Sequence, residues 1–289
     1  MNFKRFTQIE FLNEPSDSDP FLVLYKPSGL ASAPLKEGSA DNAFFEAAKR
    51  FPEILKVNGK KSCERGLLHR LDTETSGLIL IAATQSAYEA LQTSQASGRF
   101  VKYYRAVCKN ILENPNLLGN FPPSGEIMHK LLIEKHRLEI TSSFRPFGPD
   151  RKQVRPVTAL SGTAALKKSG KKIYSTTVYL KKIDIKNDMA GIFYEGDSAD
   201  IFDADDMRGT VATGENTSRL CFVEAEITNG FRHQVRSHLA WVGFPVAGDP
   251  LYDFTKSKTM FKFEAYKISF PHPVTGKMIV FDISDFLRK

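Results

Sequence analysis

Residues 69–80 read HRLDTETSGLIL, in which a histidine, an arginine and an aspartate precede a polar turn and then an apolar run. The aliphatic residues from Leu78 to Ala83 predict a short buried strand, which Gly77 opens. Asp72 is therefore expected on a loop at the entrance to a core strand. Asp, Thr and Ser side chains accept hydrogen bonds from backbone N–H groups, so turn formation is the ordinary use of such an aspartate. Only other parts of the chain can give Asp72 a chemical role.

The composition describes a folded protein with a slight basic excess. The chain has 289 residues, of which 42% are hydrophobic and 22 are Phe, so it can bury a substantial core. Lys and Arg number 40 against 33 Asp and Glu, which gives a net charge of +7. This balance is a mild indication of a polyanionic partner.

The cysteines do not predict a disulfide framework or a zinc site. Cys63, Cys108 and Cys221 are odd in number, widely spaced and form no CxxC pair, which fits a reducing compartment. The first residues lack the apolar segment of a signal peptide, and no stretch approaches the roughly 18 apolar residues of a membrane span. We therefore expect a soluble, cytoplasmic protein without a metal or cofactor.

The remaining patterns predict both strands and helices. Residues 21–26, FLVLYK, predict a strand, and helices are expected from Asp41, as the capping residue, and from about Gln85 to Ser97. Residues 99–108 are expected to form a strand that follows Gly98. Residues 111–160 are rich in turn residues around one alternating piece, 129–140, and predict a hairpin insertion.

Charge is segregated along the second half of the chain. Residues 151–182 hold nine Lys or Arg and no acid, whereas residues 195–206 hold six acids and no base. Two solvated segments would explain this pattern, because charge runs usually face water. A basic face that follows a phosphate backbone, with Tyr174 and Tyr179 interleaved, would explain it equally well.

The stretch EITNGFRHQVRSHLAWVGFPVAGDPLYD, residues 226–253, predicts a helix from about Phe231 to Gly243. Arg232 and Arg236 are four residues apart and are expected on one side of it. Because cations at a helix start oppose its dipole, an anion should hold them, and Asp72 is one candidate. His233 and His238 are five apart, which is not the spacing of a zinc-binding HExxH helix, so we predict no metal site.

Four motifs in this order resemble the RluA family of RNA pseudouridine synthases. They are HRLD with the following TSG, Lys-x-Tyr-x-Ala at 102–106, His-Gln-Val-Arg followed by His-Leu-Ala at 233–240, and Gly-Asp-x-x-Tyr at 248–252. LYKPSGL, residues 24–30, resembles the strand that begins that family's catalytic domain. Where the family commonly reads Gly-Arg-Thr-His-Gln-Ile-Arg, this chain has Gly230-Phe231-Arg232-His233, so the first arginine is displaced by one residue.

The resemblance implies an α+β catalytic domain with a long, mixed, mostly antiparallel sheet and flanking helices and loops. It places this domain at 21–289, after an N-terminal extension of residues 1–20, with a charged insertion at about 111–220. It also implies the isomerisation of specific uridines to pseudouridine in structured ribosomal or transfer RNA. The uridine must be flipped out of its stack, at a cost of a few kcal/mol. We expect a monomer that needs no partner except RNA.

Site roles follow from the same resemblance. It makes Asp72 the catalytic carboxylate, Arg236 its partner and Tyr104 the ring that stacks on the flipped base, worth on the order of 1 to 3 kcal/mol. Asp72 must be ionised, whether it attacks as a nucleophile or removes a ribose proton, and an arginine partner favours that form. Substrate-binding roles, direct or through ordering of the catalytic loop, are predicted for five residues: His69, Arg70, Lys102, Arg232 and His233.

Two other functions remain open at this point. A catalytically silent RNA-binding module would explain the basic face but leaves Asp72 without a task. A carboxylate-dependent hydrolase or N-glycosidase would need a second carboxylate, for which Glu74 is the nearest candidate.

Overall fold

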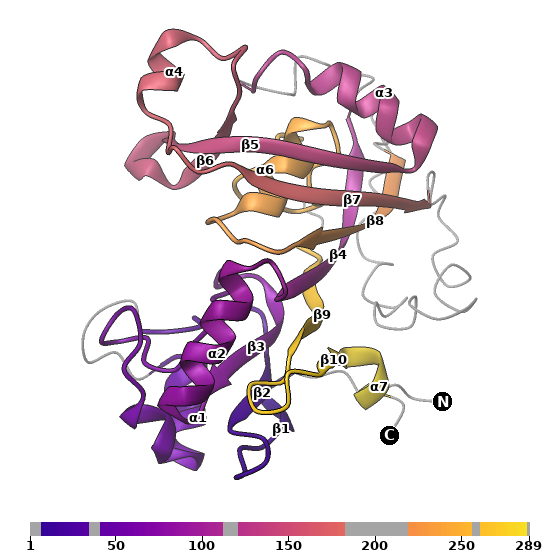
Figure 1. Cartoon of the computed structure of the whole chain (residues 1–289). Coiled ribbons are helices and arrows are strands. Elements are labelled where there is room, and N and C mark those ends of the chain that lie inside the picture. The colour runs from indigo at the N-terminus through magenta and orange to yellow at the C-terminus, as the bar shows by residue number, and fades with distance from the viewer. Residues whose placement is uncertain (1–6, 35–40, 112–120, 183–218, 256–260, 288–289) are drawn as a thin grey trace. The chain divides into compact units, whose positions relative to one another are not determined.

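The computed structural model describes residues 7–34, 41–111, 121–182, 219–255 and 261–287 (Figure 1). The acidic run at 195–206 lies outside these ranges. The chain divides into two units, each treated separately below. The first contains Met1–Tyr104 and Glu264–Lys289, and the second contains Arg105–Phe263. Among the helices of the described residues, none combines the length and the apolar character that crossing a membrane requires.

The first unit is built on a mixed sheet with the order β1-β2-β3-β9 and with β10 paired to β9. Its strands are β1 (Glu10–Asn13), β2 (Phe21–Lys26), β3 (Ser76–Ala82), most of β9 (Phe263–Pro271) and β10 (Met278–Asp282). Its helices are α1 (Ala43–Arg50), η1 (Pro52–Lys56), α2 (Gln85–Ala96) and α7 (Ile283–Leu287). Because β1 pairs with β2, residues 10–13 belong to the sheet.

The centre of this sheet is buried because β2 and β3 are apolar on both faces. Residues 22–24 and 78–82 are fully buried, which matches the continuous aliphatic runs in the sequence. β2 and β3 are antiparallel, whereas β3 and β9 are parallel. Gly77 has φ +129°, and a Cβ there would lie 2.3 Å from the carbonyl oxygen of Ala265. Glycine is therefore required where β3 meets β9.

The helix caps of this unit confirm one expectation and correct another. The Thr84 hydroxyl accepts a hydrogen bond from the Ala87 N–H at the start of α2, which ends before Gly98, as predicted. The helix predicted from Asp41 begins instead at Ala43, and its cap is the next residue, Asn42. The Asn42 side chain is fully buried and accepts from the Phe45 N–H.

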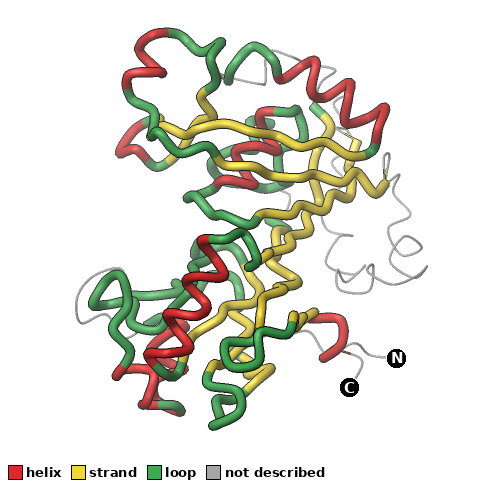
Figure 2. Tube along the Cα trace, viewed as in Figure 1, coloured by secondary structure: helices red, strands yellow, loops and turns green. Residues whose placement is uncertain are grey.

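The second unit has the strand order β8-β7-β5-β6, with antiparallel pairs throughout, and the end of β4 (Val101–Asn110) beside β8. Its other strands are β5 (Arg137–Phe147), β6 (Gln153–Val157), β7 (Tyr174–Lys182) and β8 (Arg219–Ile227). Its helices are α3 (Gly125–Lys135), η3 (Pro149–Arg151), α4 (Thr163–Lys167) and α6 (Gln234–Trp241). Figure 2 shows helices beside strands in both units, and the predicted α+β class with a mixed, mostly antiparallel sheet is confirmed.

The piece at 129–140 was predicted to alternate as a strand, and the prediction is wrong for its first half. α3 covers Gly125–Lys135 and buries His129 and Leu132, which are three apart on one helical face. The chain then turns at His136, which has φ 55°, and only β5 alternates. A short sequence that fits both the helical and the strand period takes the structure that its tertiary contacts favour.

Candidate active site

Asp72 lies in a tight turn immediately before β3, as the sequence predicts. The carbonyl oxygen of Asp72 accepts a hydrogen bond of 3.1 Å from the Thr75 N–H, which closes the turn. Thr75 is buried and Glu74 is exposed, whereas Asp72 is half-exposed. The partly exposed carboxylate of Asp72 thus lies just before a buried strand.

A second loop, residues 26–32, holds the turn in place through its backbone. The Lys26 ammonium donates to the carbonyl oxygen of Thr73 at 3.1 Å, and the Gly29 N–H donates to the same oxygen at 2.9 Å. The Ser28 hydroxyl donates to the carbonyl oxygen of Glu74 at 2.6 Å. Because these bonds go to main-chain oxygens, they fix the turn without using the Asp72 carboxylate.

Further hydrogen bonds fix both ends of the 26–32 loop, at Ser32 and at Lys26. The Ser32 hydroxyl accepts from the Leu71 N–H at 2.9 Å and donates to the Leu71 carbonyl oxygen at 2.8 Å. The Lys26 ammonium also donates to the carbonyl oxygens of Pro27 and Leu30, at 2.8 and 2.7 Å. Asp72 is therefore positioned from both sides, by Leu71 and by Thr73.

Lys26 lies in the LYKPSGL motif, but the sequence does not reveal its role as a positioning residue. It is fully buried at the end of the apolar strand β2, and burial lowers its pKa to about 7, while the carboxylates of Asp72 and then Glu74 raise it.

The first unit also contains Tyr104, His69 and Lys102. Tyr104 is 7% exposed, and burial, followed by the nearby Asp72 carboxylate, raises the pKa of its phenol, so it is neutral at pH 7. His69 Nε2 accepts from the Leu80 N–H at 3.2 Å, which ties His69 to β3. Lys102 is 2% exposed, with its ammonium 5.4 Å from the centroid of the Phe100 ring. Its burial favours a role within the site over direct contact with RNA.

Arg70 and His69 are adjacent but face different environments. Arg70 is exposed and pairs with Glu64 at 3.0 Å, so its guanidinium is on the surface beside the turn. Burial, and then the charge of Lys102, keep the pKa of His69 well below its usual range. A neutral His69 fits a structural role in the loop.

The second unit contains Arg236, and an anion holds it there as predicted. Its Nε and Nη2 each donate to one oxygen of Asp249 at 2.8 Å, and both side chains are almost fully buried. Asp249 Oδ1 also accepts from the N–H groups of Leu251 and Tyr252. Asp249 lies in the Gly-Asp-x-x-Tyr motif, but the sequence did not predict it as the partner of Arg236.

Arg232 does not share the helical face of Arg236, so that expectation was wrong. α6 begins at Gln234, after His233 with φ 53°, and Arg232 therefore precedes the helix. Its guanidinium donates to the main-chain carbonyl oxygens of Arg151 and Gln153, where no anion is involved. Because His233 has a left-handed backbone conformation, Arg232 and Arg236 are not separated by a regular helical turn, which the spacing rule assumes.

His233 and His238 make different contacts, and the described residues contain no cluster of three or more metal-binding side chains. His233 Nδ1 lies 3.3 Å from the Tyr252 hydroxyl. His238 is fully buried between the hydroxyls of Ser142 and Thr176, each 2.9 Å from a ring nitrogen. Each histidine thus has protein partners of its own.

We expect His238 to make stability depend on pH. Burial lowers its pKa to about 3, against about 6.5 when unfolded, so the unfolded chain binds more protons between these values. Its contribution is complete above pH 6.5 and is lost as pH falls, by up to about 1.4 kcal/mol per pH unit. The free energy of unfolding can be measured by urea unfolding between pH 7 and 4, followed by Trp241 fluorescence. It should depend less steeply on pH in His238→Gln than in the wild-type protein. Equal slopes in the two proteins would contradict this.

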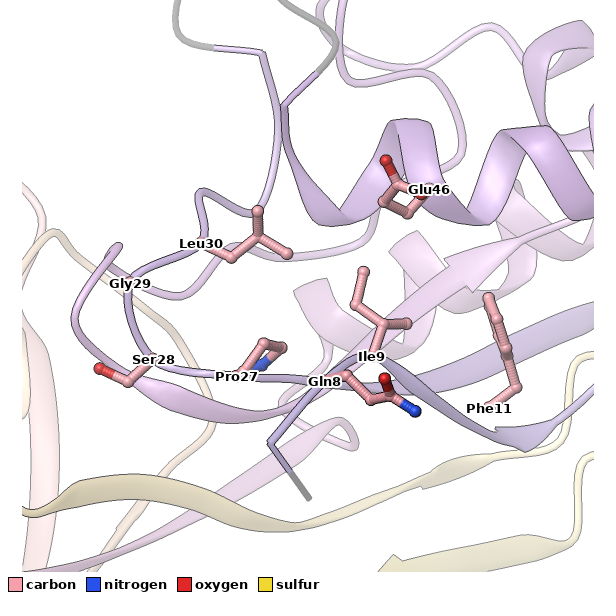
Figure 3. Close-up of a pocket in the computed structure, with 8 residues that line it drawn as sticks. All are labelled: Gln8, Ile9, Phe11, Pro27, Ser28, Gly29, Leu30 and Glu46. Atoms are coloured by element: carbon pink, nitrogen blue, oxygen red, sulfur yellow. The ribbon is translucent and has the colours of Figure 1, made fainter.

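A separate pocket is lined in part by residues 27–30 of the same loop. Figure 3 shows this cavity of about 710 Å³, which is lined by Gln8, Ile9, Phe11, Pro27, Ser28, Gly29, Leu30 and Glu46. The described residues that line this pocket include neither Asp72 nor Tyr104. We therefore place the candidate chemistry at the Asp72 turn and outside this pocket.

Comparison with known proteins identifies the family. The model of the RNA pseudouridylate synthase family matches residues 20–241. An uncharacterised RNA pseudouridine synthase of Bacillus subtilis, YhcT, is 23% identical, and the match covers 91% of this chain but only 65% of that protein. Ribosomal large subunit pseudouridine synthase D of Zymomonas mobilis is also 23% identical, with 93% of this chain and 70% of the relative covered.

Solved structures share the fold. Human RNA pseudouridylate synthase domain containing 1 superposes with a TM-score of 0.55 at 15% identity, over 98% of this chain and 85% of the other. Human RNA pseudouridylate synthase domain containing 4 gives a TM-score of 0.50 at 15% identity, over 93% and 86%. These structures support the fold, while the family match extends over more than half of the sequence. The chain therefore belongs to the RNA pseudouridylate synthase family of enzymes.

Proposed function

We propose that this protein converts specific uridines of structured RNA into pseudouridine, with Asp72 as the catalytic carboxylate. The observation that carries the proposal is the Asp72 turn, where a half-exposed carboxylate is held by backbone hydrogen bonds from residues 26–32. Rigid positioning of a reactive group is what such chemistry requires.

The reaction breaks the N1–C1′ bond of uridine, turns the uracil and joins C5 to C1′. C5 loses a proton and N1 gains one, so the product is an isomer of the substrate and no redox cofactor is needed. Ionised Asp72 either attacks as a nucleophile or removes a ribose proton to start this sequence. Both roles require the same group at the same place.

Tyr104 and Arg236 are the two other residues proposed to take part in catalysis. The neutral, largely buried phenol of Tyr104 supplies an aromatic surface near Asp72, against which a flipped base can rest. Arg236, held by Asp249 in the second unit, is proposed as a further catalytic residue of the same reaction. Arg70, beside the Asp72 turn, is proposed to contact the RNA at the position from which the base is flipped.

We further propose large-subunit ribosomal RNA as the first substrate to test, because several relatives carry that name. Exposed lysines of the second unit, at 167, 168, 171 and 172, offer a basic surface for the RNA backbone. The protein is proposed to act as a cytoplasmic monomer, and transfer RNA is the alternative substrate.

Mapping of pseudouridine tests the proposal. The purified chain is incubated with unmodified transcripts of ribosomal and transfer RNA, and pseudouridines are located by carbodiimide labelling. We expect new sites in one class of RNA. Free uracil or strand cleavage would favour an N-glycosidase or hydrolase, and bound but unmodified RNA would favour a silent binding module.

Lys26→Met should lower kcat by about 10 to 10² fold and leave KM nearly unchanged. The variant removes three hydrogen bonds from the loop that holds Thr73, and a small displacement of a reactive group has an effect of this size. Steady-state kinetics on the transcript identified by mapping measure kcat and KM. Lys60→Met is the control because Lys60 is exposed in the same unit. A change in KM alone would show that Lys26 acts through binding.

A further inference from the structure

Two arginines face each other across the β5–β6 hairpin of the second unit. β5 and β6 pair in the hairpin (Figure 1), and Arg145 and Arg155 are direct partners in its antiparallel register. Directly opposed residues place their side chains on the same face of the hairpin. Directly opposed side chains have Cβ atoms about 4.5 to 5.5 Å apart, and like charges in such a pair are destabilising. This arrangement calls for an anion near both guanidiniums.

The described protein does not supply one. Arg155 is only 3% exposed, and its Nε and Nη1 are buried without a hydrogen-bond partner, as is Nε of Arg145. None of the ion pairs within the described ranges includes either arginine. Burial, and the charge of Arg145, lower the pKa of Arg155 to about 10, so it remains charged at pH 7.

Aromatic rings surround the pair without replacing an anion. The Arg155 Cζ lies between 4.0 and 5.8 Å from the centroids of four rings, those of Phe121, Phe147, Phe254 and Tyr252. Arg145 lies 4.9 Å from the Phe147 ring. Such contacts stabilise a cation and fix its plane, but Nε and Nη1 of Arg155 still have no hydrogen-bond acceptor.

The hairpin is fixed beside the loop that holds Arg236. Gln153 Nε2 donates to the Leu251 carbonyl oxygen at 2.9 Å, and the Val154 N–H donates to the Tyr252 hydroxyl at 2.9 Å. Arg155 and Arg236 both lie within 6 Å of the Tyr252 ring centroid, at 5.8 and 5.6 Å. The opposed arginines are therefore positioned by the same loop as Arg236.

We propose that Arg145 and Arg155 form a subsite for one phosphodiester group of the RNA backbone. The subsite rests on the proposed function, because that function supplies the polyanion. A phosphate group offers several acceptor oxygens, and a guanidinium donates two parallel N–H groups to such a ligand. One phosphate between the two arginines would satisfy their free donors and remove the repulsion between them.

Salt-dependent binding tests the subsite. In the full chain carrying Asp72→Asn, the affinity for a large-subunit ribosomal RNA transcript is measured against salt concentration. Arg145→Gln should weaken binding several-fold and reduce the slope of log K against log salt by about 0.7 to 0.9, the value for one lost phosphate contact. Arg155→Lys keeps the charge but not the paired donors, and it should weaken binding as well.

Arg137→Gln is the matched control. Arg137 is an exposed arginine at the other end of β5, packed on Tyr179, so the variant loses the same charge from the same strand. The proposal is overturned if Arg145→Gln has the same affinity and slope as this control. Should Arg155→Lys fail to fold, as judged by its thermal transition, Arg145→Gln decides alone.

The source of the phosphate is tested separately. Arginine Nε–H resonances of positions 145 and 155, assigned through the variants, should shift with the RNA transcript. If inorganic phosphate at the same phosphate concentration shifts them as fully, the site belongs to free phosphate and the RNA assignment is wrong. Because these readouts measure binding, a wild-type chain that makes no pseudouridine would refute the proposed function without deciding the subsite.

Discussion

Asp72→Asn is expected to lower pseudouridine formation by about 10³ fold or more while RNA binding persists. The amide has nearly the same shape as the carboxylate but is neither a nucleophile nor a base, so the chemical step loses its reactive group. The turn itself should survive, because its hydrogen bonds go to the main chain of Leu71, Thr73 and Glu74. The free energy of unfolding should change by no more than about 0.5 kcal/mol.

Glu74→Gln is the control for this prediction. Glu74 lies two residues away in the same turn, is exposed and loses the same charge on substitution. Single-turnover assays on the transcript found by mapping should show activity close to wild type for Glu74→Gln. Comparable losses in both variants would instead indicate a pair of carboxylates, as an N-glycosidase needs.

Arg236→Met should destabilise the second unit by about 3 to 5 kcal/mol. The substitution leaves the Asp249 carboxylate buried with only two backbone donors, and an uncompensated buried charge has a cost of this size. Trp241 is the single tryptophan of the chain and lies in the same helix, α6, so its fluorescence follows this unit during urea unfolding.

Two further variants separate charge from packing. Arg232→Gln removes an exposed guanidinium from the same segment and should cost no more than about 1 kcal/mol. Adding Asp249→Asn to Arg236→Met removes the unpaired charge and keeps the acceptor, so at least about 1 kcal/mol should return. A double variant no more stable than Arg236→Met would mean that packing of the Arg236 side chain, rather than its charge, stabilises the unit.

The sequence predicts the parts of this structure that depend on local patterns. The aliphatic runs of β2 and β3 identify buried strands, and the pattern before Gly98 identifies α2 and its end. The position of Asp72 before a core strand follows from the same runs. These features require only neighbours in the chain, which a single sequence displays.

Features that depend on distant partners could not be predicted. The role of Lys26 depends on Thr73, and that of Arg155 on a strand partner and on rings as far away as Phe254. Asp249 as the partner of Arg236 belongs to the same class. Periodicity does not record which long side chains converge after folding.

The path of the chain through the two units has a consequence for synthesis on the ribosome. The first unit is completed by Glu264–Lys289, since β9 pairs with β3, whereas the second unit is one continuous segment. Domains generally fold as units while the chain emerges. All residues of the second unit are therefore synthesised before the last segment of the first unit. The strand that follows the Asp72 turn, β3, can pair with β9 only after β9 has been synthesised.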